Sequence, residues 1–391
     1  METLQPEPDA EITETGRVAE TIRQDLKSRG MIPIQMVQDG GVIDFVKPRS
    51  QEANLNDPYT GEDARLEQTL EISRRPFCII FAAHPEKRDV VLKARTKEDQ
   101  SKRAANEIDF LKFIAPVLTS LMSESGRNVT NKVRFPSLID SRKGDPPTLC
   151  LENYIKGRIS GSIHQANPEI LSEEDIDELI TFIRFFQDEL SADKIEEISP
   201  ESEFPRVDVY DKYKGDFNRR KDDLELLIGR DAVDQMESIL VENEERIRNW
   251  RTVFGSCDIN PANIIKTQSG ELALIDWERA GFTNSSAYEY GFLFATLWSN
   301  PDLQQKFLQK ACQINQDDPE FKEKFRVDFL FNRGSGELLN YWKKALEIAD
   351  TEEEREICHR AINRLSALIK DAVSKSGIWA EDMLESDKES R

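Results

Sequence analysis

Histidine and paired cysteines are scarce in this chain, which argues against the commonest protein metal sites. Only three histidines are present, too far apart in sequence for a recognisable histidine metal motif. The five cysteines include no C-x-x-C pair, so the sequence suggests no zinc site. We expect these cysteines to be buried thiols in a reducing cytoplasm, where disulfides are rare.

Long apolar runs and a positive net charge are also missing. No stretch approaches the roughly 20 apolar residues of a membrane-spanning helix, and the acidic N-terminus lacks a signal peptide's apolar region. The formal net charge of −21 argues against nucleic-acid binding, which needs basic side chains to neutralise phosphates. We therefore expect a cytoplasmic protein with neither a membrane nor a nucleic-acid partner. The acidic balance fits either a cationic substrate or simple solubility.

What is present describes a soluble globular protein with a heavily charged surface. The 391 residues are 38% apolar and 32% charged, enough for two or three lobes around a large core. Residues 1–65 form a polar extension. In it we expect an amphipathic helix over Thr13–Arg29, a hairpin of Ile32–Met36 with Val42–Val46, and a loop over 47–65.

Short strand patterns follow, over residues 66–152. Their short connections favour an antiparallel sheet. A helix is expected over Ser101–Leu121, followed by a polar loop over 123–134. The predicted strands are Leu70–Ser73, Cys78–Ala82, Asp89–Ala94, Phe135–Asp140 and Thr148–Leu151.

Helical periodicity dominates residues 153–376, and an acidic tail covers 377–391. The first helix begins near Ser172, where Ser172-Glu173-Glu174-Asp175 resembles a capping box. The further predicted helices are Tyr210–Ile228, Asp231–Trp250, Tyr288–Trp298, Leu303–Cys312, Phe321–Phe331, Gly336–Ile348 and Thr351–Lys375. The fold class is therefore α+β, with two lobes: a small antiparallel β lobe and a larger, mainly helical lobe.

One hairpin within the helical lobe, residues 254–281, concentrates the polar chemistry. Asp258 and Asn263 lie in a loop before a short apolar strand, and a second strand delivers Asp276 at its end. A turn over 268–271 joins the two strands. The arrangement predicts a cluster of oxygens that binds a hard cation and activates a hydroxyl. The alternative is an ordinary turn, since Asp and Asn favour loops.

These motifs resemble the aminoglycoside phosphotransferase and choline kinase family, which has a protein-kinase-like fold. The family's catalytic loop, H-G-D-x-x-x-x-N, is matched by S-C-D-I-N-P-A-N over Ser256–Asn263. Its metal motif, I-D-W-E or I-D-F-E, is matched by I-D-W-E over Ile275–Glu278. The resemblance covers about Leu66–Trp298.

The resemblance implies a role for each matching residue. Asp258 is the implied catalytic base, and Asn263 and Asp276 are the implied Mg²⁺ ligands. Lys93, at the end of V-V-L-K, is the implied partner of the ATP phosphates, with Glu107 as its ion-pair partner. Residues 152–155, which include Glu152 and Tyr154, are at the position of the hinge that binds adenine.

Several residues keep an alternative interpretation. Lys93 fits a solvated strand-end lysine and Glu107 a helix surface charge. Glu278 and Glu289 fit either contacts to a cationic acceptor or structural pairing. The aromatic residues Trp298, Tyr341 and Trp342 fit either the core or the wall of a substrate pocket.

The family pattern breaks just before the implied base. Ser256 and Cys257 replace the family's histidine and glycine, and the β lobe has no glycine-rich phosphate loop. The histidine is regarded as a support for the loop, so its loss affects loop geometry more than base chemistry.

The resemblance implies an ATP- and Mg²⁺-dependent phosphotransferase that acts on a hydroxyl of a small molecule such as an aminoglycoside or an amino alcohol. The alternative is a catalytically weak nucleotide-binding or regulatory protein of the same fold. Ser256, the missing glycine-rich loop and the long N-terminal extension favour it. The partners are then a nucleotide and the acceptor, and the sequence predicts no particular oligomeric state.

Overall fold

The computed structural model of the chain describes residues 24, 28, 32–38, 41–44, 77–83, 90–95, 98–124, 132–143, 148–334 and 338–380. The chain forms two compact units. Met1–Lys112 with Pro136–Tyr154 form the first, and Phe113–Phe135 with Ile155–Arg391 form the second. The predicted loop over 47–65 and strand at Leu70–Ser73 lie outside the described residues. So does the helix at Thr13–Arg29, except Gln24 and Ser28, which are helical.

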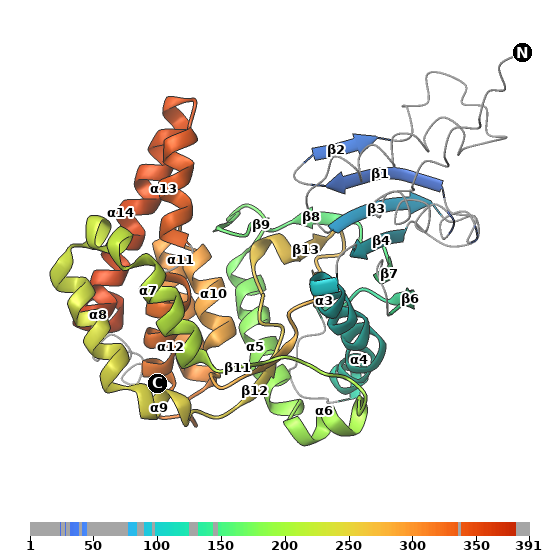
Figure 1. Ribbon diagram of the computed structural model, residues 1–391, viewed down its shortest axis with the longest axis horizontal. Helices are drawn as coiled ribbons and strands as arrows, with labels where there is room; N and C mark the ends of the chain where they lie inside the picture. The colour runs from blue at the N-terminus through green and yellow to red at the C-terminus, as the bar shows by residue number, and fades with distance from the viewer. Residues whose placement is uncertain are drawn as a thin grey trace, which may run out of the picture. The chain divides into compact units, whose positions relative to one another are not determined.

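An antiparallel six-stranded sheet organises the first unit (Figure 1). Its strand order is β2-β1-β3-β4-β7-β6. Neighbours in the sheet are also consecutive strands in the chain, except that β1 pairs with β3 and β4 pairs with β7. Helix α3 (Glu98–Asp109) packs against β7 and β4. The strands are β1 (Ile32–Gln38), β2 (Gly41–Asp44), β3 (Phe77–Ala83), β4 (Val90–Arg95), β6 (Leu138–Arg142) and β7 (Thr148–Asn153).

The second unit is mainly helical. The predicted capping box is present at α5: the Ser172 side chain accepts from the Asp175 backbone N–H, and the Asp175 side chain accepts from that of Ser172. The helices are α4 (Ala115–Glu124), α5 (Glu173–Glu189), α6 (Ala192–Ile198), α7 (Val209–Ile228), α8 (Arg230–Glu242), α9 (Glu244–Arg248), α10 (Tyr288–Thr296), α11 (Pro301–Ile314), α12 (Phe321–Asp328), α13 (Leu338–Ile348) and α14 (Glu352–Ser374).

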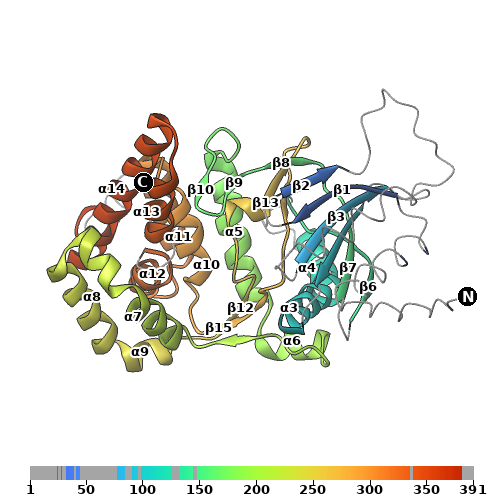
Figure 2. The same ribbon diagram turned by 45° about the horizontal axis from the view of Figure 1, so that its top comes forward.

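Short strands of the second unit form small sheets next to these helices (Figure 2). One sheet has the order β5-β14-β13-β8, another has the order β11-β15-β12, and β9 pairs with β10. The strands are β5 (Val133–Arg134), β8 (Gly157–Ile159), β9 (Gly161–Ser162), β10 (Gln165–Ala166), β11 (Arg206–Val207), β12 (Val253–Gly255), β13 (Ile264–Thr267), β14 (Leu272–Leu274) and β15 (Gly281–Thr283).

The predicted α+β class, with a small antiparallel sheet unit and a larger helical unit, is confirmed. Three local predictions are corrected. Val133–Arg134 form a strand rather than the end of a loop, because they pair with β14. The helix predicted over Asp231–Trp250 is two helices, α8 and α9, which meet at Asn243. The packed chain extends past residue 376, since Gly377–Trp379 form a 3₁₀ turn with Trp379 buried.

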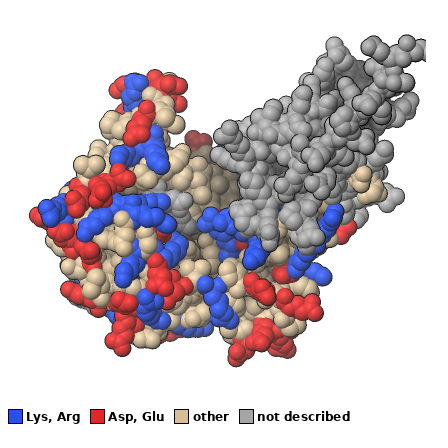
Figure 3. Space-filling view, viewed as in Figure 1, with Lys and Arg blue, Asp and Glu red and all other residues tan. Residues whose placement is uncertain are grey.

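Two π-helical turns also went unpredicted, at Phe110–Ile114 and Phe329–Gly334. No helix among the described residues is long and apolar enough to cross a membrane. Acidic and basic side chains are intermixed on the face of the second unit that Figure 3 shows.

Two helical glycines allow a direct test of how closely α10 packs against Asp328 of α12. A Cβ on Gly291 of α10 would overlap the carboxylate of Asp328, which is fully buried, whereas a Cβ on Gly215 of α7 meets nothing within 4 Å. We expect Gly291→Ala to destabilise the protein by about 1–3 kcal/mol. Gly215→Ala, the control, should stabilise it by about 0.5–1 kcal/mol through helix propensity. Urea unfolding measures both, and equal stabilities of the two variants would contradict this packing.

Candidate functional site

Strand β12 positions the loop that carries Asp258. It pairs antiparallel with β15, with Gly255 opposite Gly281, and the loop leaves the sheet at that pair. Pro261–Asn263 then form one 3₁₀ turn, in which the Asn260 side chain accepts a hydrogen bond from the Ala262 backbone N–H at 3.0 Å. The loop is therefore fixed at one end by the sheet and at the other by a capped turn.

The Asp258 carboxylate is buried and faces two amide donors. Asn260 Nδ2 lies 3.2 Å from Asp258 Oδ1, and Asn263 Nδ2 lies 3.5 Å from Oδ2. Both amides also donate to the Asp258 carbonyl, at 3.0 and 3.1 Å. Arg279 Nε is 3.7 Å from Oδ2. These contacts hold the carboxylate in one orientation.

The β13–β14 hairpin brings Asn263 and Asp276 to the same end of their sheet. The Ile275 backbone N–H donates to the Asn263 carbonyl at 2.9 Å. Asp276 is the next residue after this hydrogen bond. Asp276 has a φ of 64°, in the left-handed region that few residues other than glycine, asparagine and aspartate enter. Such a backbone is held only where its surroundings enforce it, and it occurs often at functional sites.

Glu289 of α10 supports the loop that carries Asp258. This buried carboxylate accepts from the backbone N–H of Cys257 at 2.5 Å and from that of Ile259 at 3.4 Å. A Cβ on Gly255 would lie 2.5 Å from Glu289 Oε1, so the close approach requires glycine there. Of the two interpretations of Glu289 left open by the sequence, these contacts favour the structural one.

The loop is therefore supported even though Ser256 and Cys257 replace the histidine and glycine of the family pattern. Ser256 Oγ accepts from the Asp258 backbone N–H at 3.2 Å, and Glu289 holds the residues on both sides of Asp258. The sequence left structural pairing open for Glu289 but did not identify the backbone groups of the loop as its partners. The available signal was a carboxylate in the first turn of an otherwise apolar helix, a position at which a charge needs a buried partner.

Cys257 occupies the position where the family has glycine, and its backbone is in the left-handed region, with a φ of 58°. Its Sγ lies 3.9 Å from the carbonyls of Gly255 and Gly281, which belong to adjacent strands. Burial, followed by the negative charges of Glu289 and Asp258, raises the pKa of the Cys257 thiol well above its ordinary value. The thiol is therefore neutral at physiological pH and acts in packing rather than as a nucleophile.

In the first unit, Lys93 lies in a buried cluster of charges. Its Nζ is 2.6 Å from Glu107 Oε1, so the predicted pairing of these two residues is present. Glu152 Oε1 is a second partner, at 3.0 Å. All three side chains are more than nine-tenths buried. The ammonium is thus held between α3 and β7, and the interpretation of Lys93 as a solvated strand-end lysine is wrong.

The residues of the predicted hinge, 152–155, differ in their contacts and in their exposure. The Glu152 side chain points to Lys93, whereas the next residue's backbone N–H, that of Asn153, donates to the Ser137 carbonyl at 3.1 Å. Tyr154 is 39% exposed. The adenine-binding role of this segment stays a prediction.

The predicted site residues therefore form two groups. Lys93, Glu107 and Glu152 meet within the first unit, and Asp258 contacts Asn263 in the second, next to Asp276. Among the residues that the structure describes, no group of three or more His, Cys, Asp or Glu side chains could hold a metal ion.

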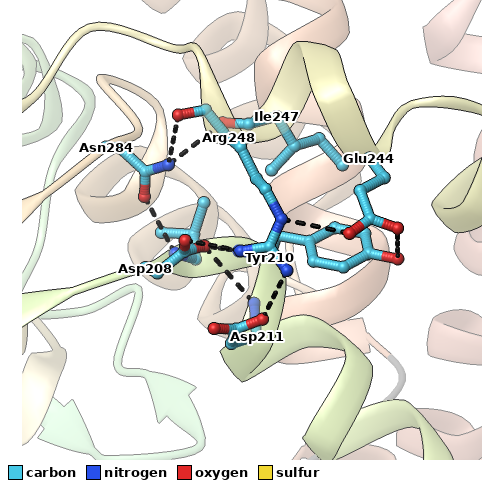
Figure 4. Close-up of polar contacts among 8 residues, drawn as sticks. Asp208, Tyr210, Asp211, Glu244, Ile247, Arg248 and Asn284 are labelled. Carbon is cyan, nitrogen blue, oxygen red and sulfur yellow. Dashed lines mark hydrogen bonds and ion pairs between the residues drawn. The ribbon is translucent and has the colours of Figure 1, made fainter.

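A polar cluster centred on Arg248 holds one end of the β11-β15-β12 sheet, opposite the end at which the Asp258 loop leaves it (Figure 4). Its guanidinium lies 2.7 Å from Asp208 and Asp211 and 3.1 Å from Glu244, and it stacks on the Tyr210 ring at 4.4 Å. Asp208 follows β11, and Arg248 ends the helix that precedes β12. The cluster therefore joins α7, α9 and the segments next to two strands of the sheet.

Asn284 connects the third strand to this cluster. It follows β15, accepts from the Val209 backbone N–H at 2.8 Å, and donates to the carbonyls of Ile247 and Arg248 at 3.0 and 3.4 Å (Figure 4). All three strands of the β11-β15-β12 sheet thus converge on one cluster. The loop with Asp258 leaves this sheet at its opposite end.

The titration of the cluster follows from its contacts. The hydrogen bond from Arg248 lowers the pKa of Asp211, and bonds from Tyr210 and then Arg248 lower that of Glu244. Burial, followed by the Glu244 contact, raises the pKa of Tyr210 to about 12. Carboxylates with lowered folded pKa values add stability above their unfolded values of about 4, and this stability is lost as the pH falls through the folded values.

The left-handed backbone of Cys257 gives one test of the loop. We expect Cys257→Val to destabilise the protein by about 1–3 kcal/mol, because a β-branched residue is strongly disfavoured at a positive φ. The control is Cys150→Val, a buried cysteine in the extended strand β7, which should change stability by less than about 1 kcal/mol. Urea unfolding under reducing conditions compares them, and equal losses would contradict the strained backbone.

The hydrogen bonds of Asn284 give a second test. We expect Asn284→Ala to cost about 1–3 kcal/mol, because it leaves buried backbone groups without partners, and to speed amide hydrogen exchange over residues 253–259. Asn300→Ala, which removes the N-cap of α11, is the control and should leave exchange in 253–259 unchanged. Unchanged exchange there in Asn284→Ala would show that the cluster does not hold β12.

No family model and no curated protein matches the chain. Among solved structures it is similar to a macrolide 2'-phosphotransferase from Brachybacterium faecium, with a TM-score of 0.48 and 16% identity over 75% of this chain and 90% of that one. For an aminoglycoside phosphotransferase from Alicyclobacillus acidocaldarius the values are 0.44 and 11%, over 76% and 90%. For an ethanolamine kinase from Plasmodium vivax they are 0.41 and 16%, over 76% and 80%.

These structures carry names from the family that the motifs around Asp258 and Asp276 resemble. With TM-scores below 0.5 and identities below 25%, the likeness assigns neither an activity nor a substrate to this chain.

Proposed function

We propose that this protein is an ATP- and Mg²⁺-dependent phosphotransferase that moves the γ-phosphate to a hydroxyl of a small molecule. The observation that carries the proposal is the loop carboxylate of Asp258, fixed by the Asn260 and Asn263 amides next to the turn at Asp276. Phosphoryl transfer depends mainly on positioning and on stabilising phosphate charge, and this cluster suits both tasks.

Asp258 acts as the base in this proposal. Its oxygens receive hydrogen bonds from amides and lie near one guanidinium, so the carboxylate has a fixed direction. An acceptor hydroxyl that donates to Asp258 is oriented for attack on the γ-phosphorus and gives up its proton to the carboxylate as the new P–O bond forms. The bond from the γ-phosphorus to the β,γ-bridging oxygen breaks in the same step, and ADP leaves.

The residues at the end of the β13–β14 hairpin fit a magnesium ion. The Asn263 amide nitrogen is engaged by Asp258, which leaves Asn263 Oδ1 and the Asp276 carboxylate as hard oxygen ligands. Two protein ligands are enough for Mg²⁺, which usually keeps waters and binds substrate phosphates. When bound, the ion neutralises phosphate charge during transfer.

Lys93 contacts the α and β phosphates of the nucleotide in this proposal. Glu107 and Glu152 hold its ammonium in place, which reduces the side-chain entropy that binding would otherwise cost. The segment with Glu152 and Tyr154 contacts adenine. We also propose a cytoplasmic location, in keeping with four free cysteines among the described residues, three of them buried.

A catalytically weak, nucleotide-binding protein of the same fold is the second candidate. It is favoured by the strained Cys257 backbone before the base and by Arg279, 3.7 Å from the Asp258 carboxylate that would have to accept a proton. Turnover separates the two candidates, since both bind nucleotide.

We expect Asp258→Asn to lower acceptor-dependent ATP consumption by about 100-fold or more, because the amide cannot take the proton. Nucleotide binding should persist. The assay measures ADP release from Mg²⁺-ATP with a panel of amino alcohols, neutral alcohols and aminoglycosides, and binding is followed with a fluorescent nucleotide. Asp234→Asn, at an exposed position on α8, is the matched control and should behave as the wild type.

Nucleotide binding without turnover in the wild-type protein would favour the weak-activity candidate. Full turnover in Asp258→Asn would remove Asp258 as the base. Failure of the wild-type protein to bind nucleotide would contradict both candidates.

A further inference from the structure

A segment near the start of the second unit lies against the turn at Pro261–Asn263 and ends in the β9–β10 hairpin. Strand β8, which precedes this hairpin, pairs with β13, and the Ser160 backbone N–H donates to the Ile264 carbonyl at 2.8 Å. Strand β9, at Gly161–Ser162, approaches the turn at Pro261–Asn263 with Cα atoms within 8 Å. Residues 157–166, which we call the acceptor hairpin, therefore adjoin the residue that contacts Asp258.

The tip of the acceptor hairpin is attached to a group of aromatic rings. The His164 ring stacks on Tyr341 of α13, with centroids 3.5 Å apart and planes 22° apart. The Trp298 indole N–H donates to the His164 carbonyl at 3.2 Å, and Trp298 packs edge-on against Trp342 at 5.3 Å. Figures 1 and 2 both show β9 between β13 and α13, the helix that carries Tyr341 and Trp342.

This region exposes apolar side chains where the rest of the chain mostly buries them. Ile159 is 55% exposed, Ile163 37% and Tyr341 39%. They are three of the seven large apolar side chains that are exposed among the described residues. Trp298, which contacts His164, and Trp342, which contacts Tyr341, are buried. Clustered apolar side chains that remain in water are typical of a binding surface, because covering them is favourable.

The acceptor hairpin also lacks the charge that a cationic ligand needs. The sequence of this hairpin, G-R-I-S-G-S-I-H-Q-A, contains no acidic residue, although the whole chain has 74. It contains one basic residue, Arg158. A polyamino sugar bound here would find no carboxylate on this segment to pair with its ammonium groups, whereas an uncharged ring would find apolar side chains to cover.

We propose that the acceptor hairpin, with Tyr341, forms the surface that binds the phosphate acceptor, and that the acceptor is a neutral alcohol with an apolar, ring-bearing body. This inference rests on the proposed phosphotransferase function and names its substrate class. The body of the acceptor lies on Ile163 and Tyr341, and its hydroxyl extends along the turn at 261–263 to Asp258. A ring stacks on the exposed Tyr341 in an offset or edge-on geometry.

The test uses two small alcohols that differ only in the group at the far end from the hydroxyl. The first, 2-phenylethanol, carries an aromatic ring, and the second, ethanolamine, carries an ammonium group. Gentamicin serves as the polyamino sugar. Saturation-transfer NMR measures the binding of each to the full chain, without any need for turnover.

We expect 2-phenylethanol to bind the wild-type protein and ethanolamine and gentamicin not to compete with it. Ile163→Asp should weaken 2-phenylethanol binding at least about tenfold, because it places a charge in the apolar surface. Tyr341→Ala should weaken it as well, by removing the ring. Ile348→Asp is the control: Ile348 is 80% exposed and lies on the same helix as Tyr341, about 10 Å further along its axis. It should leave the binding unchanged.

Two outcomes would overturn the proposal. One is 2-phenylethanol binding that Ile163→Asp and Tyr341→Ala leave unchanged while both variants keep the wild-type thermal unfolding temperature. The other is preferential binding of ethanolamine or gentamicin. Nucleotide binding and turnover with Mg²⁺-ATP are measured on the same samples. If they are present when the acceptor test fails, the substrate class is wrong and the phosphotransferase function stands; if nucleotide binding is absent, the function itself fails.

Discussion

The arrangement around Asp258 depends on one buried carboxylate, that of Glu289. It accepts from the backbone on both sides of Asp258, at Cys257 and Ile259. Backbone N–H groups in a buried loop need acceptors, since an unsatisfied one costs about 1–3 kcal/mol. A single carboxylate from a helix satisfies two of them and connects the loop to the core of the second unit. The left-handed backbone of Cys257 persists because these contacts over-determine it.

The sheet that carries the loop is held at both ends. Glu289 acts at the end where Asp258 leaves β12, and the Arg248 cluster acts at the end where Asn284 follows β15 (Figure 4). Strands of two or three residues have few ladder hydrogen bonds of their own. Side-chain contacts at the ends therefore replace the length that a longer sheet would use to fix its register.

The sequence predicted those parts of the fold and of the candidate site that depend on residues adjacent in the chain. The β13–β14 hairpin and the Ser172 capping box follow from adjacent residues, and both predictions are confirmed. Strands β11 and β15 were missed because two or three residues show no periodicity. The second partner of Lys93, Glu152, was also missed, because it comes from a strand 59 residues away in the chain whose pairing sets the contact. The pairing with Glu107 was predicted only through the resemblance to a family.

The net charge of a whole chain does not describe the chemistry of any single surface. A charge of −21 made a cationic substrate one of two interpretations of the whole chain, yet its acidic residues are intermixed with basic ones on the face that Figure 3 shows. Many form ion pairs with neighbours on the same or an adjacent helix, as Asp216 does with Lys212 and Arg219. Charges balanced in this way act at short range, because water and salt screen them within about 10 Å. Under the proposed function, substrate preference is then decided by the few side chains that reach the acceptor rather than by the net charge of the chain.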